Sequence, residues 1–524
     1  MDKVWLTSYP PGIPAEINPA EYRSLLDIME RSLAKFRDLP AYTSMDRTLT
    51  FGDLDVLSRR FAAYLQRVAG LKQGDRLAVM LPNVLQYPVA ILAAFRAGLT
   101  VVNVNPMYTP PELEHQLNDS GARAILILEN FAHTLTEAHG VDVETVIVTG
   151  AGDLLGFPKS VIANLVLRHV RRQVPEWSLP GAVSFGDALS KGRYENLEPV
   201  DLGPDDIAFL QYTGGTTGIS KGAVLTHRNL VANVLQSEAW IRPTLGSIEG
   251  QTVVTTLPLY HIFSLTANCL TMLKLGGHNL LIANPRDFAG FVRELSKHRF
   301  TFMAGVNTLF NALLHTPGFD KLDFSALRVS LGGGMAVQRA VAERWKEVTG
   351  NVLTQAWGLT ETSPAACINL PGVDFNGSIG LPIPSTTITI RDDAGNELPL
   401  GASGEICVEG PQVMRGYWNR PDETEKVMLP GQVLRTGDIG YIDPRGYVYI
   451  EDRKKDMILV SGFNVYPNEV EGVAVTHPGV LEVAAVAQPD ERAGEVVALF
   501  VVKKDPALTE EMLIDFCRKS LTGY

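Results

Sequence analysis

The chain has 524 residues, of which 45% are hydrophobic and 20% charged, and this length predicts two or more domains because single cores stop growing near about 250–300 residues. Its formal net charge of −12 argues against general nucleic-acid binding, which requires a basic surface. The four cysteines, Cys269, Cys367, Cys407 and Cys517, are widely spaced, which indicates a reducing compartment and no structural zinc site.

The first residues carry prolines and acidic side chains in place of the basic segment and apolar run of a signal peptide. The sequence also lacks an uninterrupted apolar stretch of about 18 residues, the length that a membrane-spanning helix needs. We therefore expect a cytoplasmic protein that does not span a bilayer.

Helical and strand patterns alternate over residues 51–149. Leu54, Leu57, Phe61 and Leu65 recur with a helical period. The full pattern predicts helices at 51–69, 85–97 and 111–118 and strands at 76–81, 99–104, 122–128 and 145–149. Such alternation is typical of an α/β fold with a largely parallel sheet.

A basic, roughly amphipathic helix is predicted at 158–174. Its basic and apolar side chains are Lys159, Arg168, Arg171, Arg172, Val161, Ile162, Leu165, Val166 and Val170. A helix of this kind can lie on an anionic membrane. The alternative is a surface helix that packs its apolar side on the core, and we favour it because basic amphipathic faces are common.

A glycine-rich loop at 212–222 follows an apolar run, and the rest of the chain is organised around it. Gly214, Gly215 and Gly218 let backbone N–H groups converge without interference from a Cβ atom. Hydroxyl groups and one ammonium group add donors that suit a polyphosphate, namely Thr213, Thr216, Thr217, Ser220 and Lys221. The loop therefore predicts a phosphate-binding site.

This loop is not a Walker A motif, because Gly222 occupies the position of that motif's magnesium-binding hydroxyl. The alternative is an ordinary Gly/Thr hairpin turn between two strands. The density of hydroxyl and ammonium donors favours phosphate binding.

The α/β alternation resumes after the loop, with helices at 227–240, 263–275 and 288–297 and strands at 251–256, 279–283 and 327–331. From Gly380, short strands separated by Gly, Pro and Asp predict a β-rich subdomain at about 380–452. The charged segment Arg453-Lys454-Lys455-Asp456 precedes a new α+β pattern, so we place the main boundary there. The prediction is a large domain at 1–452, built of parallel-type α/β sheets plus a small β-barrel-like subdomain, and a small, mobile α+β domain at 453–524.

The loop Tyr212-Thr213-Gly214-Gly215-Thr216-Thr217-Gly218-Ile219-Ser220-Lys221-Gly222 resembles the signature loop of the adenylate-forming superfamily. That superfamily includes acyl-CoA synthetases, luciferases and peptide-synthetase adenylation domains. The resemblance extends over essentially the whole chain and implies that a carboxylate is joined to ATP. It also implies that Thr213, Thr216, Thr217 and Lys221 act on the phosphates, with Thr216 near the metal ion.

The segment 355–362 resembles the second signature of the superfamily. By this resemblance Trp357 and Gly358 lie near adenine, the Thr360 hydroxyl reaches the α-phosphate and Glu361 holds Mg²⁺, a hard cation that suits oxygen ligands. Trp357 stands where Tyr is commoner, and either ring can stack. Taken alone, the motif is equally compatible with a strand-to-helix turn and a capping threonine.

Two further segments resemble nucleotide-contacting parts of the superfamily. In 435–440, Asp438 corresponds to a carboxylate that accepts hydrogen bonds from both ribose hydroxyls, and Arg453 contacts the ribose as well. The run Gly332, Gly333 and Gly334 resembles a loop whose bare backbone lies against adenine. Each segment alone is also compatible with a simple turn.

The remaining resemblances concern the acyl group and CoA. Segment 257–263 resembles the acyl-site segment, which assigns His261 and Phe263 to substrate positioning without proton transfer. Segment 461–471 resembles a loop that lines the pantetheine tunnel and contains Gly462, and Lys455 corresponds to the pivot of the small domain.

Residues 103–115 resemble most the bacterial long-chain fatty acyl-CoA synthetases. The implied reaction converts a long-chain fatty acid, ATP and CoA into acyl-CoA, AMP and diphosphate, with Mg²⁺ as cofactor. Peripheral association with the inner face of the membrane and a homodimer are further expectations. The alternatives are an adenylating ligase for an aryl, amino or carrier-loaded acid, and a degenerate protein that only binds the nucleotide or acyl-adenylate.

One departure from the superfamily pattern concerns the end of the chain. Relatives carry a Pro-x-x-x-x-Gly-Lys segment whose lysine touches the α-phosphate, whereas this sequence stops at Tyr524 before such a motif. Lys503, Lys504 and Lys519 do not stand in that context. We therefore expect an incomplete small domain and weakened adenylation.

Overall fold

The computed structural model describes residues 3–213, 220–454, 456–460, 463–490, 494–519 and 521. It divides into two compact units: unit 1 comprises Met1–Ser8, Thr387–Glu409 and Leu429–Tyr524, and unit 2 comprises Tyr9–Thr386 and Gly410–Met428. The predicted domain boundary between 452 and 453 falls within unit 1 and stays a prediction.

Unit 2 contains a seven-stranded sheet with the order β7-β6-β5-β3-β4-β8-β9. Its strands are β3 (Arg76–Met80), β4 (Thr100–Asn103), β5 (Ala122–Leu128), β6 (Thr145–Thr149), β7 (Val183–Ser184), β8 (Ile207–Thr213) and β9 (Lys221–Thr226). Neighbouring strands run parallel except for the antiparallel pair β8–β9. The predicted largely parallel sheet is therefore confirmed.

Unit 2 also contains a nine-stranded sheet with the order β16-β15-β14-β13-β12-β10-β11-β1-β2. Its strands are β1 (Pro40–Ser44), β2 (Arg47–Thr50), β10 (Thr252–Thr255), β11 (His278–Leu281), β12 (Phe300–Gly305), β13 (Val329–Gly332), β14 (Leu353–Gly358), β15 (Ala365–Ile368) and β16 (Leu381–Pro382). The six strands from β1 to β14 in this order pair in parallel, and antiparallel strands close both edges.

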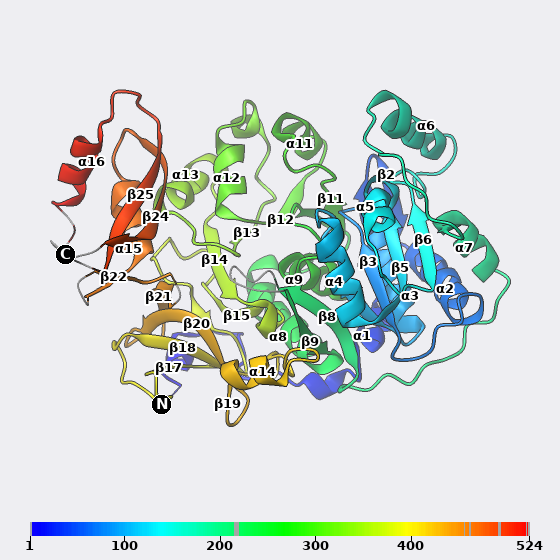
Figure 1. Cartoon of the computed structure of the whole chain (residues 1–524), viewed down its shortest axis with the longest axis horizontal. Coiled ribbons are helices and arrows are strands. Elements are labelled where there is room, and N and C mark those ends of the chain that lie inside the picture. The colour runs from blue at the N-terminus through cyan, green and yellow to red at the C-terminus, as the bar shows by residue number, and fades with distance from the viewer. Residues whose placement is uncertain are drawn as a thin grey trace. The chain divides into compact units, whose positions relative to one another are not determined.

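Helices cover these sheets, as Figure 1 shows. They are α1 (Leu25–Lys35), α2 (Phe51–Arg67), α3 (Gln86–Arg96), α4 (Pro110–Ser120), α5 (Ala132–Glu137), α6 (Lys159–Leu165), α7 (Phe185–Gly192), α8 (His227–Leu245), α9 (Ile262–Ser264), α10 (Thr271–Leu275), α11 (Phe288–Leu295), α12 (Asn307–Leu314), α13 (Arg339–Thr349) and α14 (Pro421–Val427). Short 3₁₀ or π segments are η2 (Pro19–Glu21), η3 (Glu129–Phe131), η4 (Val166–Val170), η5 (Leu265–Leu270), η6 (Phe319–Lys321) and η7 (Thr360–Thr362).

The first sheet is covered on both faces, as a parallel sheet requires. Leu113 and Leu117 of α4 pack with Met80 of β3 in one buried cluster. On the other face, the ring of Phe95 in α3 meets the ring of Phe209 in β8 edge-on, with centroids 5.5 Å apart. The βαβ alternation in the sequence thus corresponds to a helix–sheet–helix sandwich.

Side-chain caps fix where the main helices begin. In the capping box of α2, the Asp53 amide donates to the Thr50 hydroxyl and the Thr50 amide donates to the Asp53 carboxylate, both at 3.0 Å. Thr109 with Glu112 and Thr226 with Asn229 form the same motif at α4 and α8. These caps satisfy backbone donors that would otherwise lack partners.

Two helix predictions need correction. The helix predicted at 263–275 is interrupted, because the π segment η5 separates α9 from α10. The helix predicted at 158–174 forms as α6 and η4, but it has no buried residue. The favoured interpretation, in which its apolar side packs on the core, is therefore wrong.

Unit 1 contains two smaller sheets and one N-terminal 3₁₀ turn, η1 (Val4–Ser8). The five-stranded sheet comprises β17 (Thr387–Arg391), β18 (Gly404–Glu409), β19 (Met428–Leu429), β20 (Val433–Ile442) and β21 (Val448–Arg453). The four-stranded sheet, in the order β23-β22-β25-β24, comprises β22 (Ile458–Val460), β23 (Phe463–Val465), β24 (Val480–Asp490) and β25 (Gly494–Lys503), with α15 (Pro467–Ala474) and α16 (Glu510–Cys517). The predicted fold class, α/β sheets followed by a β-rich region and an α+β region, is confirmed.

All four cysteines are free and buried, Cys269 and Cys367 in unit 2 and Cys407 and Cys517 in unit 1. Burial raises the pKa of the Cys269 thiol to about 11 and that of the Cys407 thiol to about 12. Among the described residues, no helix has the length and apolar character to cross a bilayer.

Candidate active site

The predicted phosphate loop joins the ends of the hairpin β8–β9. Thr213 and Lys221 face each other as the last pair of this ladder, next to the pair Tyr212 and Gly222. The strands thus form a hairpin, as the alternative interpretation of the loop held, and this geometry is compatible with either role. Five predicted phosphate-binding residues lie outside the described part of the chain and stay predictions: Gly214, Gly215, Thr216, Thr217 and Gly218.

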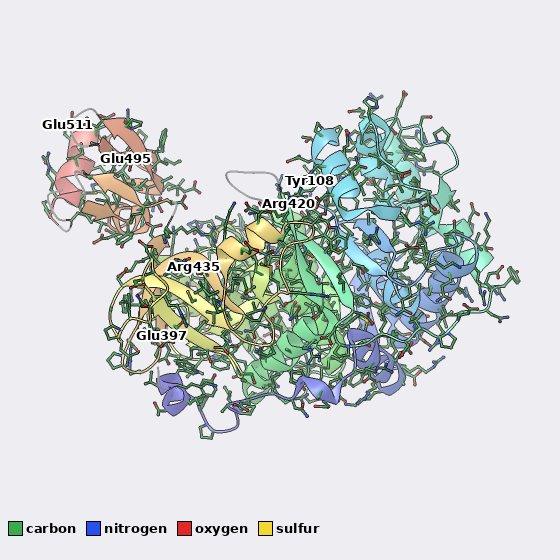
Figure 2. The ribbon with its side chains drawn as sticks, turned by 60° about the horizontal axis from the view of Figure 1, so that its bottom comes forward. Tyr108, Glu397, Arg420, Arg435, Glu495 and Glu511 are labelled. Carbon is green, nitrogen blue, oxygen red and sulfur yellow. The ribbon has the colours of Figure 1, made fainter. Side chains whose placement is uncertain are left out.

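The side of the loop formed by β8 is fastened to the neighbouring segments of unit 2. The Tyr212 hydroxyl donates a hydrogen bond of 2.6 Å to the carboxylate of Asp119, which also pairs with Arg420 at 3.1 Å. Arg420 precedes α14 and is labelled in Figure 2. Burial raises the pKa of Tyr212, which therefore remains a donor. These contacts hold the strand that leads into the loop.

Lys221, at the other side of the loop, has partners of its own. Its ammonium group lies 2.6 Å from the carboxylate of Glu423 in α14 and 5.0 Å from the ring centroid of Tyr417. The ammonium groups of Lys221 and Lys426 lower the pKa of the Glu423 carboxyl to about 2, so this carboxylate is charged at neutral pH. Lys221 therefore anchors the start of β9.

Glu361 lies in the short turn η7, and its side chain is half-buried. The Tyr417 hydroxyl donates a hydrogen bond of 2.6 Å to its Oε1, and the Met414 amide donates one of 2.7 Å to its carbonyl oxygen. Burial, with the Glu361 carboxylate as a further cause, raises the pKa of Tyr417. One segment, 410–428, therefore fixes both Glu361 and Lys221.

The donor set at Glu361 fits Mg²⁺. Within the described residues, the hydrogen-bond donors to the carboxylate reach only Oε1, which leaves Oε2 for a cation. The described residues contain no group of three or more His, Cys, Asp or Glu side chains that could enclose a metal ion. A single protein carboxylate suits Mg²⁺, which commonly takes its remaining ligands from water and substrate phosphates.

The glycine run begins at the end of β13. A Cβ atom at Gly332 would lie 2.8 Å from the Val337 side chain, and one at Gly333 would lie 3.0 Å from the ring of Phe263. Gly334 has a φ of +77°, a conformation that favours glycine. Gly333 thus brings the predicted adenine loop against Phe263, a predicted acyl-site residue.

Trp357 and Gly358 end β14 beside Glu361. Trp357 is half-buried and lies opposite Cys367 of β15. A Cβ atom at Gly358 would lie 1.8 Å from the Pro364 carbonyl oxygen, so this position requires glycine. Thr360 follows in the η7 turn and is half-buried. The second signature is therefore a strand end followed by a tight turn.

His261 caps the short helix α9 through its ring. Its Nδ1 accepts a hydrogen bond of 3.3 Å from the Phe263 amide. Although part of the ring reaches solvent, the surrounding protein lowers the pKa of His261 because it desolvates the charged form. A neutral imidazole at this place can orient a substrate without repelling or supplying charge.

Asp438 and Arg453, in unit 1, contact each other. They are paired across β20 and β21, and the Arg453 Nε lies 3.1 Å from the Asp438 carboxylate. Asp438 is buried, whereas about half of the Arg453 side chain is exposed. The buried carboxylate thus has a guanidinium group as its ion-pair partner. Lys455 and Gly462 lie outside the described residues, so the hinge and tunnel roles stay predictions.

Sequence reasoning missed Tyr417 and Glu423. Tyr417 lies within the segment Arg415-Gly416-Tyr417-Trp418 and Glu423 follows it, and this segment carries no phosphate- or metal-binding pattern of its own. Tyr417 forms an isolated β-bridge with Ala223 of β9, a pairing that no local pattern in the sequence indicates. Their partners lie 56 and 202 positions earlier in the chain, so spacing alone does not reveal the contacts.

The sequence matches known proteins along its length. Residues 29–418 match the family described as AMP-binding enzyme, and residues 469–524 match the AMP-binding enzyme C-terminal domain. The chain is 56% identical over 529 residues to a protein of Escherichia coli O6:H1 named long-chain-fatty-acid–CoA ligase, and the match covers 100% of this chain and 93% of that protein. A protein of the same name from Haemophilus influenzae is 49% identical, with coverage of 100% and 94%.

A solved structure agrees with these matches. The crystal structure of ATP-bound MatB from Rhodopseudomonas palustris superposes with a TM-score of 0.81 at 28% sequence identity. The superposition covers 95% of this chain and 93% of that chain. The agreement thus extends to the fold of nearly the whole chain.

Proposed function

Because the chain belongs to the AMP-binding enzyme family, we propose that it is a ligase that activates long-chain fatty acids to acyl-CoA through an acyl-adenylate. The observation that carries this function is the full-length similarity to ligases of that name. The predicted superfamily and the predicted enzyme class, an AMP-forming acid–thiol ligase, are confirmed.

The reaction has two steps, with ATP and CoA as co-substrates. A carboxylate oxygen of the fatty acid attacks the α-phosphorus of ATP, and the bond to diphosphate breaks. The CoA sulfur then attacks the acyl carbonyl carbon, and AMP leaves. Since the first step brings two anions together, the site must neutralise charge around the phosphates.

Glu361 would hold Mg²⁺, which when bound neutralises charge on the phosphate oxygens. The hydrogen bond from Tyr417 to Oε1 supports this role, because it orients the carboxylate before the ion arrives. Thr213 and Thr360 would donate to phosphate oxygens, together with Thr216 and Thr217. Lys221, which is held by its ion pair with Glu423, would act on the phosphates.

The nucleotide base would lie against the glycine run 332–334 and Trp357. The absence of Cβ atoms and the half-buried indole support this assignment. Asp438 and Arg453 would bind the ribose hydroxyls, and the buried, ion-paired state of Asp438 supports it as a charged acceptor. Each of these roles is a separate proposal for mutagenesis.

His261 and Phe263 would position the acyl carboxylate. The lowered pKa of His261 supports a neutral ring, which adds no positive charge beside the nucleotide. We further infer a cytoplasmic enzyme that associates peripherally with a membrane, because long-chain fatty acids partition into bilayers. A homodimer stays a prediction.

The test measures diphosphate release across a panel of fatty acids, aryl acids and amino acids, followed by thioester formation with CoA. We expect the fastest release and CoA-dependent product with long-chain fatty acids. Faster turnover of an aryl or amino acid, or preferential loading of a carrier protein, would establish the alternative ligase. ATP binding without diphosphate release from any acid would establish a protein that only binds the nucleotide.

A further inference from the structure

The helix formed by α6 and η4 presents its apolar residues to solvent. Ile162, Leu165 and Val170 are 56%, 49% and 76% exposed, and Val166 lies between them. These four residues follow the spacing i, i+3, i+4 and i+8, which places them on one face of a helix. Phe157, just before the helix, is 88% exposed. The apolar stripe, defined as these five residues, thus faces outward.

The opposite face of the same helix is attached to unit 2. The Asn164 side chain accepts a hydrogen bond of 2.8 Å from the Gly152 amide and donates one of 2.8 Å to Asp153. One turn later, Arg168 donates a hydrogen bond of 2.8 Å to Glu129, which is only 1% exposed. The outward direction of the apolar stripe is therefore fixed by polar contacts on the inner face.

The charge around the apolar stripe is opposite to that of the whole chain. Residues 157–175 contain four Lys or Arg and no Asp or Glu, whereas the chain has a net charge of −12. Of the four, Arg168 is paired with Glu129, and Lys159, Arg171 and Arg172 have no ion pair with a described residue. Three cations beside an exposed apolar stripe complement an anionic surface with an apolar interior.

We infer that the apolar stripe and these three cations form a docking surface for an anionic lipid bilayer. The helix would lie in the plane of the interface, with Ile162, Leu165 and Val170 at the boundary with the acyl chains. Lys159, Arg171 and Arg172 would contact lipid phosphates. This inference rests on the proposed function, because a bilayer is the store of the long-chain substrate.

The test compares binding of the full chain to phosphatidylcholine vesicles with and without phosphatidylglycerol, by flotation. One variant carries Arg171→Glu and Arg172→Glu, and another carries Leu165→Ser and Val170→Ser. A matched control carries Val68→Asp and Lys72→Glu. These exposed positions lie at the C-terminal end of α2 and in the segment that follows it. Because these side chains are exposed, the variants should keep the wild-type melting temperature.

We expect charge reversal to lower binding to anionic vesicles by tenfold or more, since each basic side chain near such a surface contributes roughly fivefold in affinity. The remaining binding should depend less on salt than that of wild type. The serine variant should lower binding to both kinds of vesicle, and the control should match wild type. Wild-type vesicle binding in both the charge-reversal variant and the serine variant would overturn the docking surface.

Two further measurements separate this inference from its alternatives. Diphosphate release from a water-soluble medium-chain acid, measured without vesicles, should be unchanged in both variants. A loss of this activity would show that the substitutions damage the fold or the enzyme function, and not only the docking surface. The oligomeric state of the serine variant is measured by light scattering. If it differs from that of wild type while vesicle binding stays intact, the apolar stripe is a contact between two copies of the chain and the inference is wrong.

Discussion

The hydroxyl of Tyr417 donates a 2.6 Å hydrogen bond to the carboxylate of Glu361, although the two residues stand 56 positions apart. Tyr417 belongs to the segment 410–428, which returns to unit 2 after two strands of unit 1. The ring of Tyr417 also faces the ammonium group of Lys221. One side chain therefore links the proposed metal ligand to the base of the proposed phosphate loop.

Replacement of Tyr417 by Phe keeps the ring beside Lys221 and removes the hydrogen bond to Glu361. Because a hydrogen bond to a charged group contributes about 1.5–3 kcal/mol, we expect adenylation to fall roughly tenfold to hundredfold. The Mg²⁺ concentration that gives half-maximal ATP binding, measured by calorimetry, should rise. Tyr194→Phe, at a position 79% exposed, serves as control. An unchanged Mg²⁺ requirement would show that Tyr417 does not orient the ligand.

Glu361→Gln keeps the shape of the side chain and removes its charge. Diphosphate release should fall about a hundredfold or more, the usual effect of losing a charge-stabilising group at a reacting centre. The melting temperature should stay close to that of wild type, because Oε1 still accepts from Tyr417. The control is Glu347→Gln, a largely exposed carboxylate. Normal adenylation by a stably folded Glu361→Gln protein would remove Glu361 from the site.

Because of His227, we expect the free energy of unfolding to depend on pH. Its ring is fully buried, its Nδ1 accepts a hydrogen bond of 3.2 Å from the Leu25 amide, and burial lowers its pKa to about 4. Between about pH 6.5 and 4 the unfolded chain binds a proton that the folded chain does not, so stability falls as pH decreases through this window. The full loss is roughly 3 kcal/mol, from about 1.36 kcal/mol per pH unit.

The measurement is urea unfolding between pH 7.5 and 4 for wild type and His227→Asn, whose carbonyl can replace Nδ1 as acceptor. The variant should have a smaller slope of unfolding free energy against pH, whatever its absolute stability. His139→Asn, at an exposed position, should keep the wild-type slope. Equal slopes for all three proteins would show that His227 is not a neutral buried base.

Arg168 and Arg171 lie in or beside the same helix but should differ in their effect on stability. Arg168→Gln leaves the buried Glu129 carboxylate without its cation, and removal of one partner of a buried pair costs about 3–5 kcal/mol. Since Arg168 is half-exposed, we expect about 1–3 kcal/mol here. Arg171→Gln should change the free energy of unfolding by less than about 0.5 kcal/mol. Similar losses in both variants would contradict the anchoring role of Arg168.

Local patterns in the sequence were sufficient for elements whose residues alternate or repeat clearly. The strand predicted at 145–149 has the bounds that the structure shows, and the helix predicted at 51–69 extends two residues beyond the end of α2, whereas α1 was not predicted. The helix η5 shows the limit, because hydrogen bonding there shifts to the π pattern without any change in apolar spacing. Periodicity identifies a helix but not its hydrogen-bond register.

Periodicity also cannot tell which side of an amphipathic helix faces the protein. Asn164 and Arg168 hold the inner face of α6 and η4, and their partners Asp153 and Glu129 lie elsewhere in the chain. For the same reason, the motif around Glu361 was found while its partner Tyr417 was not. The residues of a site that act through contacts distant in sequence become visible only when the fold is known.

The buried cysteines give each unit a chemical reporter of its own opening. A thiol that is both shielded and rarely ionised reacts with a labelling reagent only after the surrounding structure opens. Mass spectrometry can distinguish the peptides of Cys269 and Cys367 from those of Cys407 and Cys517 in one sample. The labelling rates should therefore yield an opening free energy for unit 2 and another for unit 1 without any substitution, and substrate added to the sample should slow the rates of whichever unit it stabilises.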